Sequence, residues 1–327
     1  MSNKAKANIL LLITAFIWGT AFVAQKEGGA IGAFTFNGIR TFLGGLVLIP
    51  FILVGHKRSQ AKGLPQPDHE LGLNEVPAAV AAAGPLFSKL ELIGGFACGT
   101  ALFVAGSLQQ FGLAFTTAGK AAFITTLYVV FCPILSMIIT KKKTRPLIWI
   151  CVLVDCVGLY LLCMTDASFS IQIGDTLVIL CAVAFAMQMV LVDVFIGRVD
   201  GLKLSCIQFL VAGLEGMICM LIFEQPIVLS DILSGWFPIL YAGVMSCGIG
   251  YTFQVLGQRY ADPAVAALIL CLESVFGVLA GAVLLHETMS PRELLGCAIM
   301  FAVVVVSNLP EKKKGPEAPV EGGGVSQ

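Results

Sequence analysis

Residues 263–285 limit what this chain can become more than any other segment. All 23 positions are apolar except Glu273 and Ser274, and a helix of that length can cross a bilayer. Glu273 is the eleventh of these residues, so its carboxylate lies near the bilayer midplane. A charge there costs ~2.5–3.5 kcal/mol on insertion scales. The side chain therefore needs a polar or wet surrounding, which indicates a function.

The same segment occurs a second time, 145 residues earlier in the chain. Residues 257–291 align without a gap on residues 112–146, and the matched pairs are Gly257 with Gly112, Leu272 with Leu127, Phe276 with Phe131 and Pro291 with Pro146. Glu273 falls on Tyr128 in this alignment. The sequence therefore predicts two related halves.

The composition places the chain in a membrane. Hydrophobic residues make up 57% and charged residues 12%, whereas soluble domains carry about 25% charged residues. The formal net charge is zero, so no nucleic-acid partner is expected. The eleven cysteines are scattered through apolar segments without a CxxC pair, which indicates neither a disulfide framework nor a zinc site. We expect an all-α integral membrane protein.

Apolar runs separated by glycine, proline and charged residues predict ten spans: 8–25, 35–54, 91–112, 118–140, 146–164, 174–195, 204–223, 236–256, 263–285 and 291–308. The first five form one unit, residues 8–164, with a solvated cytoplasmic loop at 55–90. The other five form a second unit, residues 174–308. The charged, glycine-rich tail 309–327 is expected to be disordered.

The basic residues fix the expected orientation. With the N-terminus inside, 16 of the 20 lysines and arginines fall on the cytoplasmic side and three on the outer side. This asymmetry places both termini in the cytoplasm, for a multi-pass protein of the inner or plasma membrane. Each unit has an odd number of spans, so the second unit is predicted to run inverted relative to the first. Inverted five-helix repeats are typical of secondary transporters, with the site near the midplane between them.

Several stretches resemble one family. They are AFIWGTAF (15–22), AFTFNGIR (33–40), GSLQQFGLAFTTAGKAAFITTLYVVFCP (106–133) and LYAGVMSCGIGYTFQVLGQRYADPAVAALILCLESVF (240–276). Over residues 8–308 the chain resembles the EamA-type branch of the drug/metabolite transporter superfamily. The resemblance implies a cavity lined by spans 1, 3, 4, 6, 8 and 9, and it favours export. In that family a proline usually follows the span-9 glutamate, whereas Ser274 stands here, so a kink is expected to be weaker or absent.

The predicted substrate-binding residues are Trp18, Gln109, Thr125, Tyr128, Gln188, Gln254 and Glu273. Trp18 is either an aromatic wall that stacks on a ring or covers a cation, or a packing residue. Gln109 and Gln254 correspond in the two halves; they border opposite mouths of the cavity or form interhelical hydrogen bonds. Glu273 carries a proton, binds a substrate ammonium group or makes a structural hydrogen bond.

Four other charged residues lie deep in spans or near their ends. Asp155 and Glu215 are expected to pair within the bundle or at a dimer contact. Arg40 and Lys120 are expected to extend their charged groups to the outer interface. For Lys120 the alternative is attraction of an anionic group at the outer mouth.

Enzyme motifs are missing from the sequence. His286-Glu287 begins a zinc-protease pattern, but Ser290 occupies the position of the second histidine. We therefore expect no catalytic or metal site and no cofactor. The predicted function is secondary transport of a small polar or amphipathic metabolite, such as an amino acid, by alternating access. The alternatives are a receptor or scaffold on the same fold, or an intramembrane enzyme. The expected partners are the substrate and the bilayer, with a proton and a second copy of the chain as further candidates.

Overall fold

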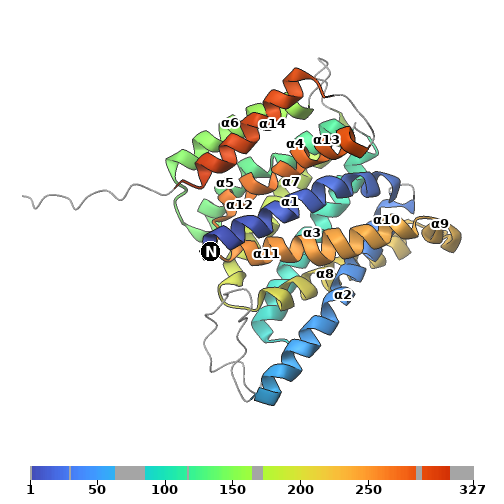
Figure 1. Ribbon diagram of the computed structural model, residues 1–327. Coiled ribbons are helices and arrows are strands. Elements are labelled where there is room, and N and C mark those ends of the chain that lie inside the picture. Colours follow the sequence, from blue (N-terminus) through green and yellow to red (C-terminus); the bar gives the residue numbers. More distant parts are fainter. Residues whose placement is uncertain are drawn as a thin grey trace, which may run out of the picture.

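A computed structural model describes residues 2–28, 31–62, 85–115, 118–163, 172–284 and 289–309. Helices account for nearly all of these residues, and no strand occurs among them. Eight helical segments in this part of the chain are long and apolar enough to cross a membrane. The structure is therefore an all-helical bundle of the membrane type (Figure 1).

The first half contains α1 (Asn3–Gly28), α2 (Ala33–Lys62), α3 (Lys89–Leu113), α4 (Ala118–Thr126), α5 (Tyr128–Thr140) and α6 (Pro146–Cys163). The second half contains α7 (Ile173–Ile196), α8 (Gly201–Phe223), α9 (Leu229–Ser234), α10 (Trp236–Tyr241), the π-helix η2 (Ala242–Tyr251), α11 (Thr252–Gln258), α12 (Pro263–Leu270), α13 (Leu272–Leu284) and α14 (Pro291–Ser307).

Local sequence signals explain several helix ends. Ser88 with Glu91 and Ser290 with Glu293 form capping boxes at the starts of α3 and α14. The end of α5 is marked by Lys141, which adopts a left-handed conformation with φ of 57°. One predicted boundary was wrong, because α2 continues to Lys62 and so includes the start of the loop expected at 55–90. Residues 63–84 of that loop and 310–327 of the tail lie outside the described residues.

Helices of the two halves pack against each other in matching pairs. At one end α6 lies against α14, and at the other α2 lies against α8 (Figure 1). Glycines allow both contacts to be close: a methyl group on Gly216 would lie 2.7 Å from the Cα of Gly38, and one on Gly296 would lie 2.6 Å from the carbonyl oxygen of Gly158. Between these pairs, α3 contacts α7, whereas α1 contacts η2 and α11. This pattern supports two related halves, and their inversion stays a prediction.

The two aligned spans are interrupted at equivalent points. The first breaks between α4 and α5 at Leu127, where the Leu127 amide bonds the Ile124 carbonyl at 3.2 Å. The second breaks between α12 and α13 at Cys271, whose carbonyl accepts from the Ser274 amide at 3.1 Å. These i→i+3 bonds are tight 3₁₀-type turns. Cys271 keeps right-handed helical angles, with φ of −54° and ψ of −24°, so the expected weaker or absent kink stays a prediction.

The breaks face each other across the two halves. The hydroxyl groups of Thr126 and Ser274 lie 3.2 Å apart, and the Cys271 thiol donates to the Thr126 carbonyl at 3.8 Å. Ser274, the residue that replaces the usual proline, thus makes a contact that a proline could not make. Both interrupted spans meet at the centre of the bundle.

Topology reporters test the inverted arrangement. A reporter fused after Lys143 should be cytoplasmic, and one fused after Met289 should be external. Each position follows one of the two interrupted spans, and inverted halves place such nearly equivalent positions on opposite sides of the membrane. Alkaline phosphatase is active only outside the cytoplasm and a fluorescent protein only inside it, so fusions to the two reporters at each position show on which side that position lies. Both reporters on the same side would contradict the inversion.

Candidate functional site

A small polar cavity lies next to the breaks. Its wall is formed by Trp18, Arg40, Gln109, Thr125, Phe185, Ser246, Tyr251 and Glu273. The cavity volume is ≈ 40 Å³, which is enough for a water molecule but too small for a metabolite. The cavity is therefore contracted in this conformation, and a metabolite would fit only if the helices around it separated.

Glu273 provides the negative charge of this wall. It begins the first turn of α13 directly after the break, and its side chain is 5% exposed. The Tyr128 hydroxyl donates to Glu273 Oε1 at 3.4 Å, so the two residues paired by the sequence alignment touch. Gly19 of α1 packs on the Glu273 backbone, since a methyl group there would lie 2.6 Å from the Glu273 carbonyl oxygen. Tyr128 thus contacts the carboxylate, and α1 packs against the main chain that carries it.

Arg40 provides the positive charge, and the expectation that it extends to the outer interface was wrong. Its side chain is only 7% exposed. Nε and Nη2 both donate to Asn37 Oδ1, at 2.9 and 2.7 Å, and the guanidinium lies 5.1 Å from the centre of the Phe36 ring. Asn37 in turn packs against Gly106 of α3: a methyl group on Gly106 would lie 2.5 Å from the side-chain nitrogen Nδ2 of Asn37. These contacts turn the charge inward.

The π-helix η2 builds the aromatic part of the wall. Trp18 Nε1 donates to the Ser246 carbonyl at 3.4 Å, and the Trp18 ring lies 4.4 Å from the Tyr251 ring, centre to centre. One turn earlier on α1, the Thr14 hydroxyl donates to the Gly250 carbonyl at 2.9 Å. π-Helical turns are often found at functional sites. Here η2 directs backbone carbonyls towards α1 and places Tyr251 on the cavity.

The predicted glutamines separate into two environments. Gln109 lines the cavity, and its Nε2 donates to Thr125 Oγ1 at 3.3 Å. Gln254 and Gln188 lie instead in a buried amide network: Gln254 Nε2 donates to Gln188 Oε1, and Gln188 Nε2 donates to Gln208 Oε1, both at 3.1 Å. Neither residue reaches the cavity wall in this state, so their role in binding stays a prediction.

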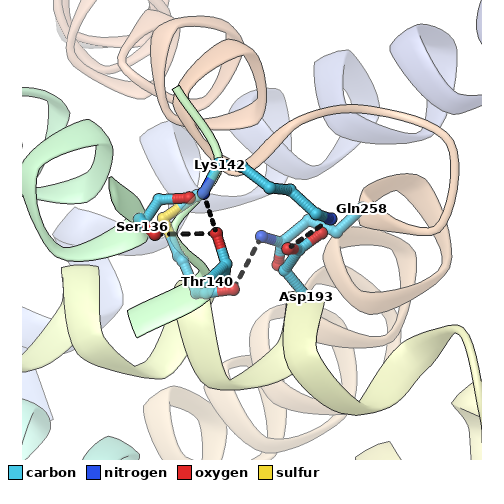
Figure 2. Close-up of polar contacts among 6 residues, drawn as sticks. Ser136, Thr140, Lys142, Asp193 and Gln258 are labelled. Atoms are coloured by element: carbon cyan, nitrogen blue, oxygen red, sulfur yellow. Dashed lines mark hydrogen bonds and ion pairs between the residues drawn. The ribbon is translucent and has the colours of Figure 1, made fainter. Parts of the chain in front are cut away.

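The amide network of Gln188, Gln208 and Gln254 ends close to the C-terminal end of α5, which Lys141–Lys143 follow. Figure 2 shows Gln258, whose Nε2 donates to the Met189 carbonyl at 3.1 Å, close to the pair formed by Lys142 and Asp193. The Lys142 ammonium lies 3.8 Å from Asp193 Oδ2 and its side chain is 72% exposed. An exposed pair of this kind contributes about 0–1 kcal/mol. This ion pair can therefore break at low cost, whereas the buried apolar contact of α5 with α7 remains.

Two further charged residues behave differently from each other. Glu215 pairs within the bundle as expected, accepting from the Thr100 hydroxyl at 2.7 Å. Asp155 is fully buried, its oxygens make no hydrogen bond of standard geometry, and the Cys271 thiol is the one side chain that approaches them among the described residues. Its expected pairing within the bundle is thus limited to this weak thiol donor, and the dimer contact stays a prediction. The side chain of Lys120 lies outside the described residues.

Four wall residues were not predicted as binding residues: Arg40, Phe185, Ser246 and Tyr251. Phe185 and Tyr251 look like ordinary apolar positions of a span, and only the glycines at 243, 248 and 250 hint that the helix around Ser246 is irregular. The described residues contain no cluster of three or more potential metal ligands. The cavity wall itself offers charged groups, hydrogen-bonding groups and aromatic rings.

Cysteine labelling tests which side chains face the cavity. On a background without native cysteines, Thr125→Cys should react with small thiol reagents, because Thr125 lies on the wall. Its counterpart in the other half, Leu270, is buried in the apolar core, so Leu270→Cys should stay unlabelled. Mass spectrometry measures both reactions. Equal labelling of the two variants would contradict the assignment of the wall.

Comparison with known proteins gives a consistent picture. Residues 5–164 and 172–309 match the model of the EamA-like transporter family. An "uncharacterized transporter" of Archaeoglobus fulgidus is 26% identical, over 93% of this chain and 87% of the relative. Another from Clostridium kluyveri is 20% identical, over 94% of each chain. A solved crystal structure, 18% identical, superimposes with a TM-score of 0.71 over 93% of this chain and 96% of its own, which shows a shared fold.

Proposed function

Since the chain belongs to the EamA-like transporter family, we propose that this membrane protein is a secondary transporter of a small zwitterionic metabolite, such as an amino acid. The direction we propose is export, and the mechanism is alternating access between the two halves. The family membership and the transporter relatives support the general function. The substrate class follows from the cavity.

The observation that carries the proposal is the pair of opposite charges on one small wall. Arg40 and Glu273 both line the cavity, and no ion pair joins them in the described part of the chain. Taking two charges out of water is costly unless each finds a partner. A ligand with a carboxylate and an ammonium group supplies both partners at once. Arg40 would bind the carboxylate through its planar array of donors, and Glu273 would bind the ammonium.

The rest of the wall suits a ligand with an apolar side chain. Trp18, Phe185 and Tyr251 surround the charged groups with rings. Aromatic faces attract both apolar groups and cations, so they complement the ammonium as well as the side chain. Gln109 and Thr125 add neutral hydrogen-bonding groups.

Alternating access is supported by three features that allow movement. The cavity is too small for a metabolite in this conformation, both interrupted spans meet beside it, and the ion pair of Lys142 with Asp193 adds little to the contact between this end of the chain and α7. Interrupted helices near the midplane are typical hinge and binding elements of secondary transporters.

Transport in proteoliposomes tests the proposed function. We expect the purified protein to exchange labelled neutral amino acids across the membrane faster than empty liposomes do. Amines, carboxylic acids and sugars form the comparison panel, since each lacks one of the two charges or both. Binding without movement of any compound would favour a receptor on the same fold, and chemical conversion of a compound would favour an enzyme.

A further inference from the structure

Asp155 of α6 is a buried carboxyl group that the proposed substrate site does not use. Its side chain is 0% exposed, and among the described residues only the Cys271 thiol, a weak donor, approaches its oxygens, which make no hydrogen bond of standard geometry. An ionised carboxylate without a partner costs several kcal/mol to bury. The same group with its proton bound is neutral and far less costly. Burial therefore favours the protonated form in this conformation.

No described cation faces Asp155. The helices packed against α6 are α14, α4, α12 and α13. On α14, Arg292 lies over the Tyr160 ring at 5.2 Å and Glu293 caps the start of its own helix, while the Lys120 side chain of α4 lies outside the described residues. The other ionisable groups near these helices include Tyr128, Cys271, Glu273 and Cys297, together with Cys151, Cys156 and Cys163 of α6 itself. Arg145, before the start of α6, acts on Cys151 and donates to the Ser307 carbonyl at 2.9 Å.

The position of Asp155 connects it to the moving part of the bundle. Cys271, at the break between α12 and α13, is its neighbour. Tyr128, at the break between α4 and α5, is close to both residues, and its hydroxyl donates to Glu273 on the cavity wall. Asp155 thus lies on α6, which packs against α4, α12 and α13, the helices on either side of the two breaks, and it does not line the cavity. Separation of the breaks would bring water to a carboxyl group that is dry in this conformation.

We propose that Asp155 is a proton-binding site. In this conformation its carboxyl group holds a proton. When the breaks open, the O–H bond breaks, the proton passes to water, and a carboxylate remains. The bundle can close again only after the proton returns, so the site links the conformational cycle to a proton gradient. This link rests on the proposed transport function, whereas proton binding itself does not.

Infrared difference spectroscopy on the full-length protein in lipid nanodiscs tests proton binding without a substrate. We expect a carbonyl band of a protonated carboxyl group in an apolar environment at neutral pH. Asp155→Asn should abolish this band, Asp155→Glu should shift it, and Glu215→Gln and Glu273→Gln should retain it. A band that survives Asp155→Asn unchanged would overturn the proposal. The Glu variant keeps the test decisive if the Asn variant does not fold.

Proteoliposomes test the coupling, with a labelled mixture of neutral amino acids as the probe and a trapped pH-sensitive dye. In the wild-type protein a pH gradient should drive accumulation. Asp155→Asn should lose this response by at least roughly tenfold yet retain exchange at equal pH, because its cavity is intact. A variant that responds to the gradient like the wild type would contradict the link. If the wild type moves no amino acid, the proposed function fails, and the infrared band still decides proton binding.

Discussion

Arg40→Gln should weaken binding of a neutral amino acid by roughly 10- to 150-fold, because a hydrogen bond to a charged group contributes about 1.5–3 kcal/mol. Glutamine keeps a donor near Asn37 but loses the charge and the planar array that matches a carboxylate. Scintillation proximity or tryptophan fluorescence, with Trp18 on the wall, would measure the affinity. Arg40→Lys should recover only part of the loss.

Two controls separate the loss of a ligand contact from general damage. The primary amide of the same amino acid lacks the carboxylate, so its affinity should be unchanged by Arg40→Gln. Arg292→Gln removes an arginine that lies over the Tyr160 ring, outside the cavity wall, and should leave transport unchanged. Equal losses for the amino acid and its amide would show that Arg40 acts on the structure of the site and does not bind the carboxylate.

Glu273→Gln should reduce exchange of the same amino acid by roughly 10- to 150-fold at subsaturating concentration and at every pH, because the variant cannot pair with the ammonium group. The substitution keeps the size of the side chain and an acceptor for the Tyr128 hydroxyl, which lies 3.4 Å away in the wild type. The expected loss in affinity is again about 1.5–3 kcal/mol. Counterflow in proteoliposomes measures exchange without a gradient, and Glu215→Gln, whose carboxylate bonds Thr100 outside the cavity, is the matched control.

The pattern of losses in Glu273→Gln distinguishes three roles. Loss of both exchange and accumulation fits binding of the ammonium. Loss of accumulation with normal exchange would instead make Glu273 a proton carrier and move that role away from Asp155. If both activities are normal over the whole pH range, Glu273 is a structural hydrogen-bonding group and the proposed charge pair is wrong.

Hydropathy and the internal alignment predicted much of this architecture. They predicted an all-helical membrane protein, of which the described residues show eight helical segments long and apolar enough to cross a membrane. They also paired Tyr128 with Glu273 and brought Trp18, Gln109 and Thr125 to the same central region, while the ten-span division stays a prediction. These inferences succeed because a bilayer sets the length of a span and because related halves place equivalent positions near one axis. The two residues paired in the alignment are in contact in the structure.

The remaining features depend on contacts between helices that no local pattern encodes. Arg40 lies near the start of α2 and was expected to extend outward, but Asn37 and Phe36 of the same helix turn its guanidinium inward. The π-helix η2 forms where Trp18 and Thr14 of a distant helix bond its carbonyls. The break at Cys271 occurs without a proline, supported across the halves by Thr126 and Ser274.

The difference between Tyr128 and Glu273 has a kinetic consequence. If the two halves exchange conformations during the cycle, a symmetric pair would present the same site to both faces of the membrane. A phenol on one half and a carboxylate on the other make the inward-facing and outward-facing forms unequal in free energy. Such a carrier needs different substrate concentrations on its two faces to reach half of its maximal rate. At equilibrium the net flux must still be zero, so the maximal rates of inward and outward transport differ in the same ratio as these concentrations. It therefore rectifies flow kinetically while the gradients alone set the final distribution.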